Sequence, residues 1–81
     1  MTTSTQSDLT RGDIARELLA GNWQILDKAV EAKLQRLNRP AAIREAHFDF
    51  MYYAGYYDGE NYRKIVDSIH QWDESVGFKL E

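Results

Sequence analysis

The stretch Phe48-Asp49-Phe50-Met51-Tyr52-Tyr53-Ala54-Gly55-Tyr56-Tyr57-Asp58-Gly59-Glu60-Asn61-Tyr62 decides the fold class, because it could form either a helix or a strand. Phe48, Phe50 and Tyr52 alternate with Asp49 and Met51, which is a weak strand pattern. Two longer sets of residues follow helical spacing instead, Ile43-His47-Phe50-Ala54-Tyr57 and Phe48-Met51-Tyr52-Gly55-Tyr56. Good helix formers, among them three alanines, precede them, so we predict a helix over 40–57 and an all-α fold.

The same stretch holds seven of the ten aromatic residues of the chain. Wound as a helix, its rings form two lines roughly half a turn apart: Phe48, Tyr52 and Tyr56 in one, and Phe50, Tyr53 and Tyr57 in the other. A helix that packs on a single neighbour needs an apolar arc of only about 100°. The rings therefore exceed what one neighbouring helix can cover.

Three explanations of the surplus rings stay open. The helix lies among several packed helices, its outer rings form an interface with another chain, or they line a small-molecule pocket. Tyrosine is enriched at interface hot spots, so we name as interface candidates Phe48, Tyr52, Tyr53, Tyr56, Tyr57, Tyr62, Asp49 and Asp58. If Tyr53 and Tyr57 lie outside the core, replacing either by Ala should weaken association more than folding.

The N-terminal half carries a second helical pattern. Thr10 is a typical N-cap, and Asp13 suits the positive end of the helix dipole. Apolar residues then follow at spacings of three and four, namely Ile14, Ala15, Leu18, Leu19, Trp23, Leu26, Val30, Leu34 and Leu37. Gly21-Asn22 interrupts this pattern, which predicts helices over 10–20 and 23–38 with Asn22 capping the second, or one long helix with a weak point.

Two further signals divide the rest of the chain. Asn38-Arg39-Pro40 predicts that one helix ends near Asn38 and the next begins at Pro40, antiparallel to the first. Asp58-Gly59 is a turn signal that separates 40–57 from a last helix over 60–76, or forms a soft point in one long helix. We therefore predict an antiparallel bundle of three to four helices. Its expected core includes Trp23, Leu26, Leu37, Ile65, Ile69 and Trp72.

The length of 81 residues allows one domain, which we place at 9–81. Residues 1–8 are small and polar, so we expect a frayed or disordered tail there. So short a chain buries only about two thirds of its unfolded surface and is marginally stable without help. Cysteine is absent, which excludes disulfides and thiolate metal sites. The remaining way to stabilise such a small domain is oligomerisation or docking on a larger partner.

The net charge of −3 argues against a nucleic-acid-binding protein, which needs a face rich in lysine and arginine. The charge is uneven: residues 1–40 carry a net +1 and residues 41–81 a net −4. The second half could thus present an acidic face to a basic partner. The sequence has no apolar run long enough for a transmembrane helix and no secretory signal pattern at its start, so we expect a cytoplasmic protein.

No motif in the sequence specifies a reaction or a cofactor. Glu45, His47 and Asp49 would fan out over separate faces of a helix, and His70 with Asp73 would supply only two metal ligands. No serine or threonine stands in a nucleophile motif. We therefore predict no enzyme activity, no cofactor and no metal. A basic cluster near the middle turn fits a solvated helix end, with an acidic partner as the alternative: Lys28, Lys33, Arg36, Arg39 and Arg44.

These observations favour a small acidic helical module that associates with itself and with a surface of a larger protein assembly. In general character only, such a chain resembles accessory and inhibitor proteins of bacteriophages and mobile elements. A DNA-binding or transcription-associated helical regulator is one alternative, since helices joined near Asn38–Pro40 could mimic a helix-turn-helix. A module that binds a small ligand between subunits is the other.

Overall fold

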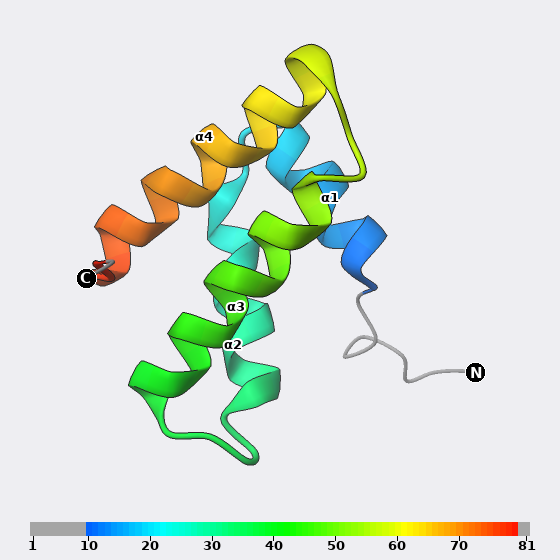
Figure 1. Ribbon diagram of the computed structural model, residues 1–81. Helices are drawn as coiled ribbons and strands as arrows, with labels where there is room; N and C mark the ends of the chain where they lie inside the picture. The colour runs from blue at the N-terminus through cyan, green and yellow to red at the C-terminus, as the bar shows by residue number, and fades with distance from the viewer. Residues whose placement is uncertain (1–9, 80–81) are drawn as a thin grey trace.

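The structure, a computed structural model, describes residues 10–79 and is all-α over this range (Figure 1). Four α-helices and one short 3₁₀ helix follow one another: α1 (Arg11–Leu19), η2 (Trp23–Ile25), α2 (Leu26–Lys33), α3 (Arg39–Ala54) and α4 (Gly59–Val76). The predicted all-α bundle is confirmed, with no strand in the described range. The predicted N-terminal tail lies outside the described residues.

The first break in the chain separates α1 from the helical segment after it. Thr10 caps α1 in a reciprocal capping box with Asp13, as the sequence predicts. Gly21 then adopts a φ of 88°, a left-handed conformation that suits glycine and ends the helical path. The alternative of one long helix is therefore wrong. The predicted capping role of Asn22 is also wrong, because its side-chain amide donates to Glu17 (2.9 Å) instead.

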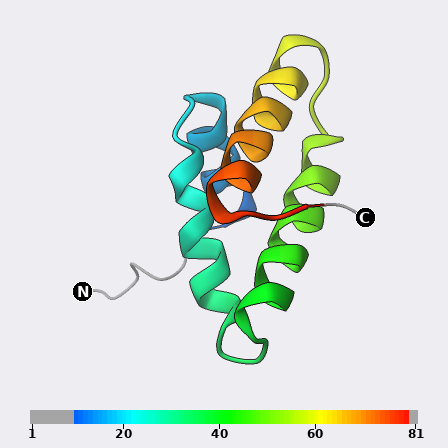
Figure 2. The ribbon, with the colours of Figure 1, turned by 90° about the vertical axis from the view of Figure 1, so that its left-hand side faces the viewer.

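Helix α2 ends at Lys33, five residues before the predicted boundary. Residues 34–37 form turns, and Asn38 then caps α3 by accepting a hydrogen bond from the Ala41 amide (3.0 Å). This cap and Pro40 in the first turn fix where α3 begins, so the chain must reverse its direction before residue 38. Figures 1 and 2 show the result: α2 and α3 lie side by side and are joined by a short loop.

Helices α3 and α4 are also separate. Helix α3 ends at Ala54, three residues earlier than predicted, and residues 55–57 continue in tighter turns. Gly59 begins α4 with a φ of 61°, which rules out one merged helix. At the other end Gly77 adopts a φ of 76°, and its amide and that of Phe78 bond to carbonyls of the last turn. The predicted stop at Gly77 is thus confirmed.

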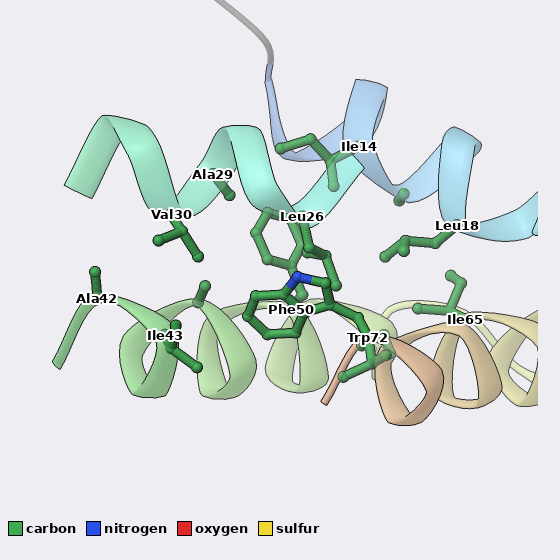
Figure 3. Packing of buried hydrophobic residues seen from close by; sticks show 14 residues of the cluster. Ile14, Leu18, Leu26, Ala29, Val30, Ala42, Ile43, Phe50, Ile65 and Trp72 are labelled. Atoms are coloured by element: carbon green, nitrogen blue, oxygen red, sulfur yellow. The ribbon is translucent and has the colours of Figure 1, made fainter. Parts of the chain in front are cut away.

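All four α-helices contribute to one hydrophobic core, in which α4 packs against both α1 and α3. Figure 3 shows Leu26, Phe50 and Trp72 meeting within it. Four predicted core residues are fully buried: Leu26, Ile65, Ile69 and Trp72. The other two, Trp23 and Leu37, are only partly buried and pack against the outside of the core.

Polar groups inside the core have partners. The Trp72 indole donates to Asp27 (3.0 Å), and the Ser68 hydroxyl donates to the Leu18 carbonyl (2.7 Å). These two hydrogen bonds tie α4 to α2 and to α1. They satisfy buried groups whose desolvation would otherwise destabilise the fold. None of the helices in the described range is both long and apolar enough to cross a membrane.

Candidate functional site

Helix α3 displays its aromatic residues in two directions. Phe50 and the alanines at 42, 46 and 54 are buried, and they set the side of α3 that faces the core. Because successive residues turn by about 100°, Phe48 and Tyr52 fall on the opposite side. The sequence predicted the two lines of rings, and the packing of α2 and α4 decides which line is covered.

The outward line is exposed to solvent. The side chains of Phe48, Tyr52 and Tyr56 keep 46%, 74% and 71% of their surface accessible. We call these three residues the aromatic face. Tyr52 and Tyr56 contact each other edge-to-face, with ring centroids 6.0 Å apart. Hydrogen bonding with the Tyr52 side chain, together with its charge, raises the pKa of Tyr56 above its usual 10.0.

The other predicted interface residues are either partly buried against the core or located at the start of α4, apart from the aromatic face. Tyr53 and Tyr57 are partly buried and pack against the core. Tyr62 is 41% exposed, but it belongs to the first turns of α4. Asp58 is exposed at the N-cap position of α4 without a side-chain capping bond. Of the eight candidates, three therefore form one exposed surface, on α3 and the turn that follows it.

Asp49 belongs to a network of ion pairs that ties α3 to α1 and α2. Its carboxylate lies 3.2 Å from the Arg11 guanidinium and 3.5 Å from the Lys33 ammonium. Lys33 also contacts Glu45 (3.3 Å), and Arg36 contacts the same carboxylate (3.0 Å). Hydrogen bonds from Arg36 and Lys33 hold the pKa of Glu45 below its usual value. Glu45 therefore stays ionised well into the acid range.

For Lys33 and Arg36, this network corrects the interpretation of the basic cluster as a solvated helix end, whereas Lys28, Arg39 and Arg44 are exposed as that interpretation predicts. The Lys33 side chain is only 14% exposed, and both Lys33 and Arg36 are paired with carboxylates of α3. Their role is to hold α2 against α3. Sequence reasoning missed Arg11 altogether, because 38 positions separate it from Asp49 and no periodic pattern links the two.

An open groove of about 990 Å³ runs between the aromatic face and the ion-pair network. Buried apolar side chains of three helices, Ile14, Ala29 and Phe50, line it together with Tyr52, Tyr53 and Tyr56. Arg11, Lys33 and Arg36 also line it, and so does Asp49. The groove thus offers an apolar base and a rim with charges of both signs.

The histidines do not form a metal site with the carboxylates near them. His47 is buried, and its Nδ1 lies 2.8 Å from Oδ2 and 3.0 Å from Oδ1 of Asp73. Burial raises the pKa of Asp73, and the bond from His47 acts against this shift. His70 is exposed, and its charge also acts to lower the pKa of Asp73. Within residues 10–79, no three side chains of His, Asp or Glu gather closely enough to hold a metal ion.

Comparisons with protein-family models, with curated proteins and with solved structures find no match to this chain. The site must therefore be interpreted from its own chemistry.

Proposed function

We propose that this chain is a small helical interaction module that binds another protein through the aromatic face. One observation carries the proposal: the rings of Tyr52 and Tyr56 remain about three quarters exposed, and Phe48, whose ring lies 6.4 Å from that of Phe78, remains about half exposed. Rings in a small domain are normally recruited to its core, because their burial is strongly favourable. Three rings left largely exposed on α3 and the turn after it are better explained by a second chain that covers them.

The extent of the surface supports this proposal. At about 200 Å² per ring, the exposed parts of the aromatic face amount to about 380 Å². That area is already comparable to the largest apolar patch of an ordinary monomer, about 300–600 Å², and such patches are often functional. A standard protein interface buries about 800 Å² on each partner, so the three rings would supply roughly half of one.

The type of side chain also supports a protein partner. Tyrosine combines a large apolar ring with a hydroxyl that can form hydrogen bonds, and it is enriched at the energetic centres of interfaces. Two of the flanking carboxylates are satisfied within the chain, because Asp49 and Glu45 are paired with Arg11, Lys33 and Arg36. Binding through the rings therefore need not leave these two charges without a partner. A module of this kind acts as an accessory or inhibitory subunit by occupying a surface of a larger assembly.

The groove favours one second candidate, a small-ligand site that is completed by a partner. Its volume of about 990 Å³ lies at the upper end of the range of ligand pockets, and its base is apolar. Two of its lining residues, Tyr52 and Tyr56, belong to the aromatic face, so a chain bound there would border the groove. The DNA-binding alternative has less support, because Lys33 and Arg36 are already paired with carboxylates.

Site-specific photocross-linking tests the proposed function. The full chain is produced in cells of its source with a benzophenone amino acid in place of Tyr52, and separately in place of Gln71, which is exposed on α4. The expected result is a covalent adduct with a protein chain from position 52, and little or none from position 71. Equal adduct formation at the two positions would show that the aromatic face has no special affinity for proteins.

A further inference from the structure

We propose that the aromatic face binds a second copy of this chain, α3 against α3 and antiparallel, about a two-fold axis between Phe48 and Tyr52. This inference rests on the proposed function, because it takes the aromatic face as a protein-binding surface and names the partner. Two-fold dimers are the commonest oligomers, and they require a surface that is complementary to itself. The aromatic face and the charges beside it meet that requirement.

The spacing of the rings places them in matching pairs. With the axis midway between Phe48 and Tyr52, Phe48 of one copy lies opposite Tyr52 of the other, and Tyr52 lies opposite Phe48. The two-fold axis thus produces two identical Phe48–Tyr52 pairs in one interface. The paired rings lie at the same level along the two helices, so the distance between the helix axes, about 8–10 Å for packed helices, sets how far apart they are. Rings that point toward each other across such a gap can reach the 4.5–7 Å centroid distances that aromatic pairs prefer.

The charges on α3 favour the antiparallel direction. Arg44 is exposed and makes no ion pair within residues 10–79, and the same holds for Asp58 just beyond the end of α3. In the antiparallel arrangement, Arg44 reaches about the level of Tyr56 of the second copy, which precedes Asp58 by two residues in the turn after α3. A parallel arrangement would instead place Arg44 beside Arg44. The antiparallel dimer thus gives both unpaired charges a partner of opposite sign.

Tyr56 adds to the same contact. Its exposed ring lies opposite Arg44 of the second copy, and a guanidinium over a tyrosine ring is attracted by its π face. Ala41 and Gly55 lie near the two ends of the outward side of α3, and such small residues let two helices approach closely. The carboxylates of Glu45 and Asp49 do not oppose the contact, because they are already paired within each copy.

Sedimentation equilibrium of the purified full chain tests the dimer. We expect reversible dimerisation that Tyr52→Ala weakens by about 30-fold or more, as for an interface hot spot. Gln71→Ala, on the exposed side of α4, should leave the dissociation constant unchanged. Arg44→Asp and Asp58→Arg should each weaken the dimer by roughly 2- to 5-fold, and the double variant should recover most of the loss. Circular dichroism confirms that each variant is folded.

The outcomes separate this inference from the proposed function. A chain that sediments as a monomer at every concentration overturns the dimer, and so does a dimer that Tyr52→Ala leaves intact. A double charge reversal that binds no better than the single variants overturns the antiparallel arrangement. If position 52 cross-links only to a different protein, the second copy is excluded as the partner while the proposed function stands. If position 52 yields no adduct at all, both fail.

Discussion

Two ionisable side chains are buried against each other where α3 meets α4, His47 and Asp73. The His47 ring is 2% exposed, and the Phe78 ring lies over it at a centroid distance of 4.7 Å. Burial raises the pKa of the Asp73 carboxyl because a charge is less stable in the core than in water. The bond from His47 partly offsets this cost. The His47–Asp73 pair therefore adds little net stability, but removing His47 would leave the buried Asp73 carboxylate without its partner.

Replacing His47 by Leu should reveal that cost. At neutral pH the Asp73 carboxylate would be buried without its partner, and we expect a loss of about 1–3 kcal/mol in the free energy of unfolding. A carboxyl whose pKa is raised by folding contributes its stability fully below its unfolded pKa, about 3.9, and loses it as the pH rises through the folded value. The deficit of the variant relative to the wild type should thus grow from acid to neutral pH.

Urea denaturation at a series of pH values measures this deficit. The matched control is His70→Leu, which changes the exposed histidine of α4 and should have little effect at any of these pH values. A deficit for His47→Leu that stays constant from acid to neutral pH would assign it to packing alone. In that case the ionisation of Asp73 would not contribute to it.

At the scale of single elements, the ends of the helices depend on a few side-chain bonds. Two asparagines precede helices, but only one caps. Asn38 accepts from the Ala41 amide (3.0 Å) at the start of α3, whereas the Asn22 amide donates to Glu17. Asn38 matters for the candidate site because α3 carries the aromatic face.

Asn38→Ala should cost about 1 kcal/mol through loss of the N-cap bond. For a domain of this size, that corresponds to a fall of roughly 4–8 °C in the midpoint of thermal unfolding. Asn22→Ala removes the same side chain from an exposed position without a cap and should change stability by less than about 0.5 kcal/mol. Thermal denaturation followed by circular dichroism compares the two variants. Equal losses would contradict the assignment of capping to Asn38 alone.

The sequence predicted those features that depend on neighbouring residues. Thr10, Pro40 and Gly77 mark helix ends by local chemistry, and all three ends lie close to their predicted positions. The end of α2 at Lys33 was not predictable in this way. The apolar spacing continues to Leu37, and only the need to reverse direction before the Asn38 cap ends the helix earlier.

In the candidate site too, the features that depend on neighbouring residues were predictable, and those that depend on tertiary packing were not. Helical spacing separates Tyr52 from Phe50, since the two residues fall about 200° apart around α3. It does not tell which of them faces the core, because that depends on where α2 and α4 pack. The pairing of Arg11 with Asp49 joins segments 38 residues apart, and no local signal encodes it. Tertiary packing, rather than propensity, therefore decides which rings remain exposed.

At the scale of the whole molecule, the chain combines a small core with a large exposed aromatic surface. An 81-residue domain without cysteine has few means of stabilisation beyond its own core. Association through the aromatic face would add to that stability, because a partner that binds only the folded state shifts the folding equilibrium by mass action. Stability and self-association should then be coupled.

We therefore expect the apparent stability of the wild-type chain to rise with its concentration. Raising the total concentration to about 100 times the dissociation constant leaves about 7% of the chains as free monomer, which should add roughly 1.6 kcal/mol per chain. In Tyr52→Ala the unfolding midpoint should be nearly independent of concentration, because the exposed ring contributes to the interface and little to the core. Urea midpoints measured over a wide range of concentration make the comparison. If the midpoints of the wild type and of Tyr52→Ala rise equally with concentration, the stabilising contact lies elsewhere on the surface. If the wild-type midpoint does not change with concentration, folding and association are independent.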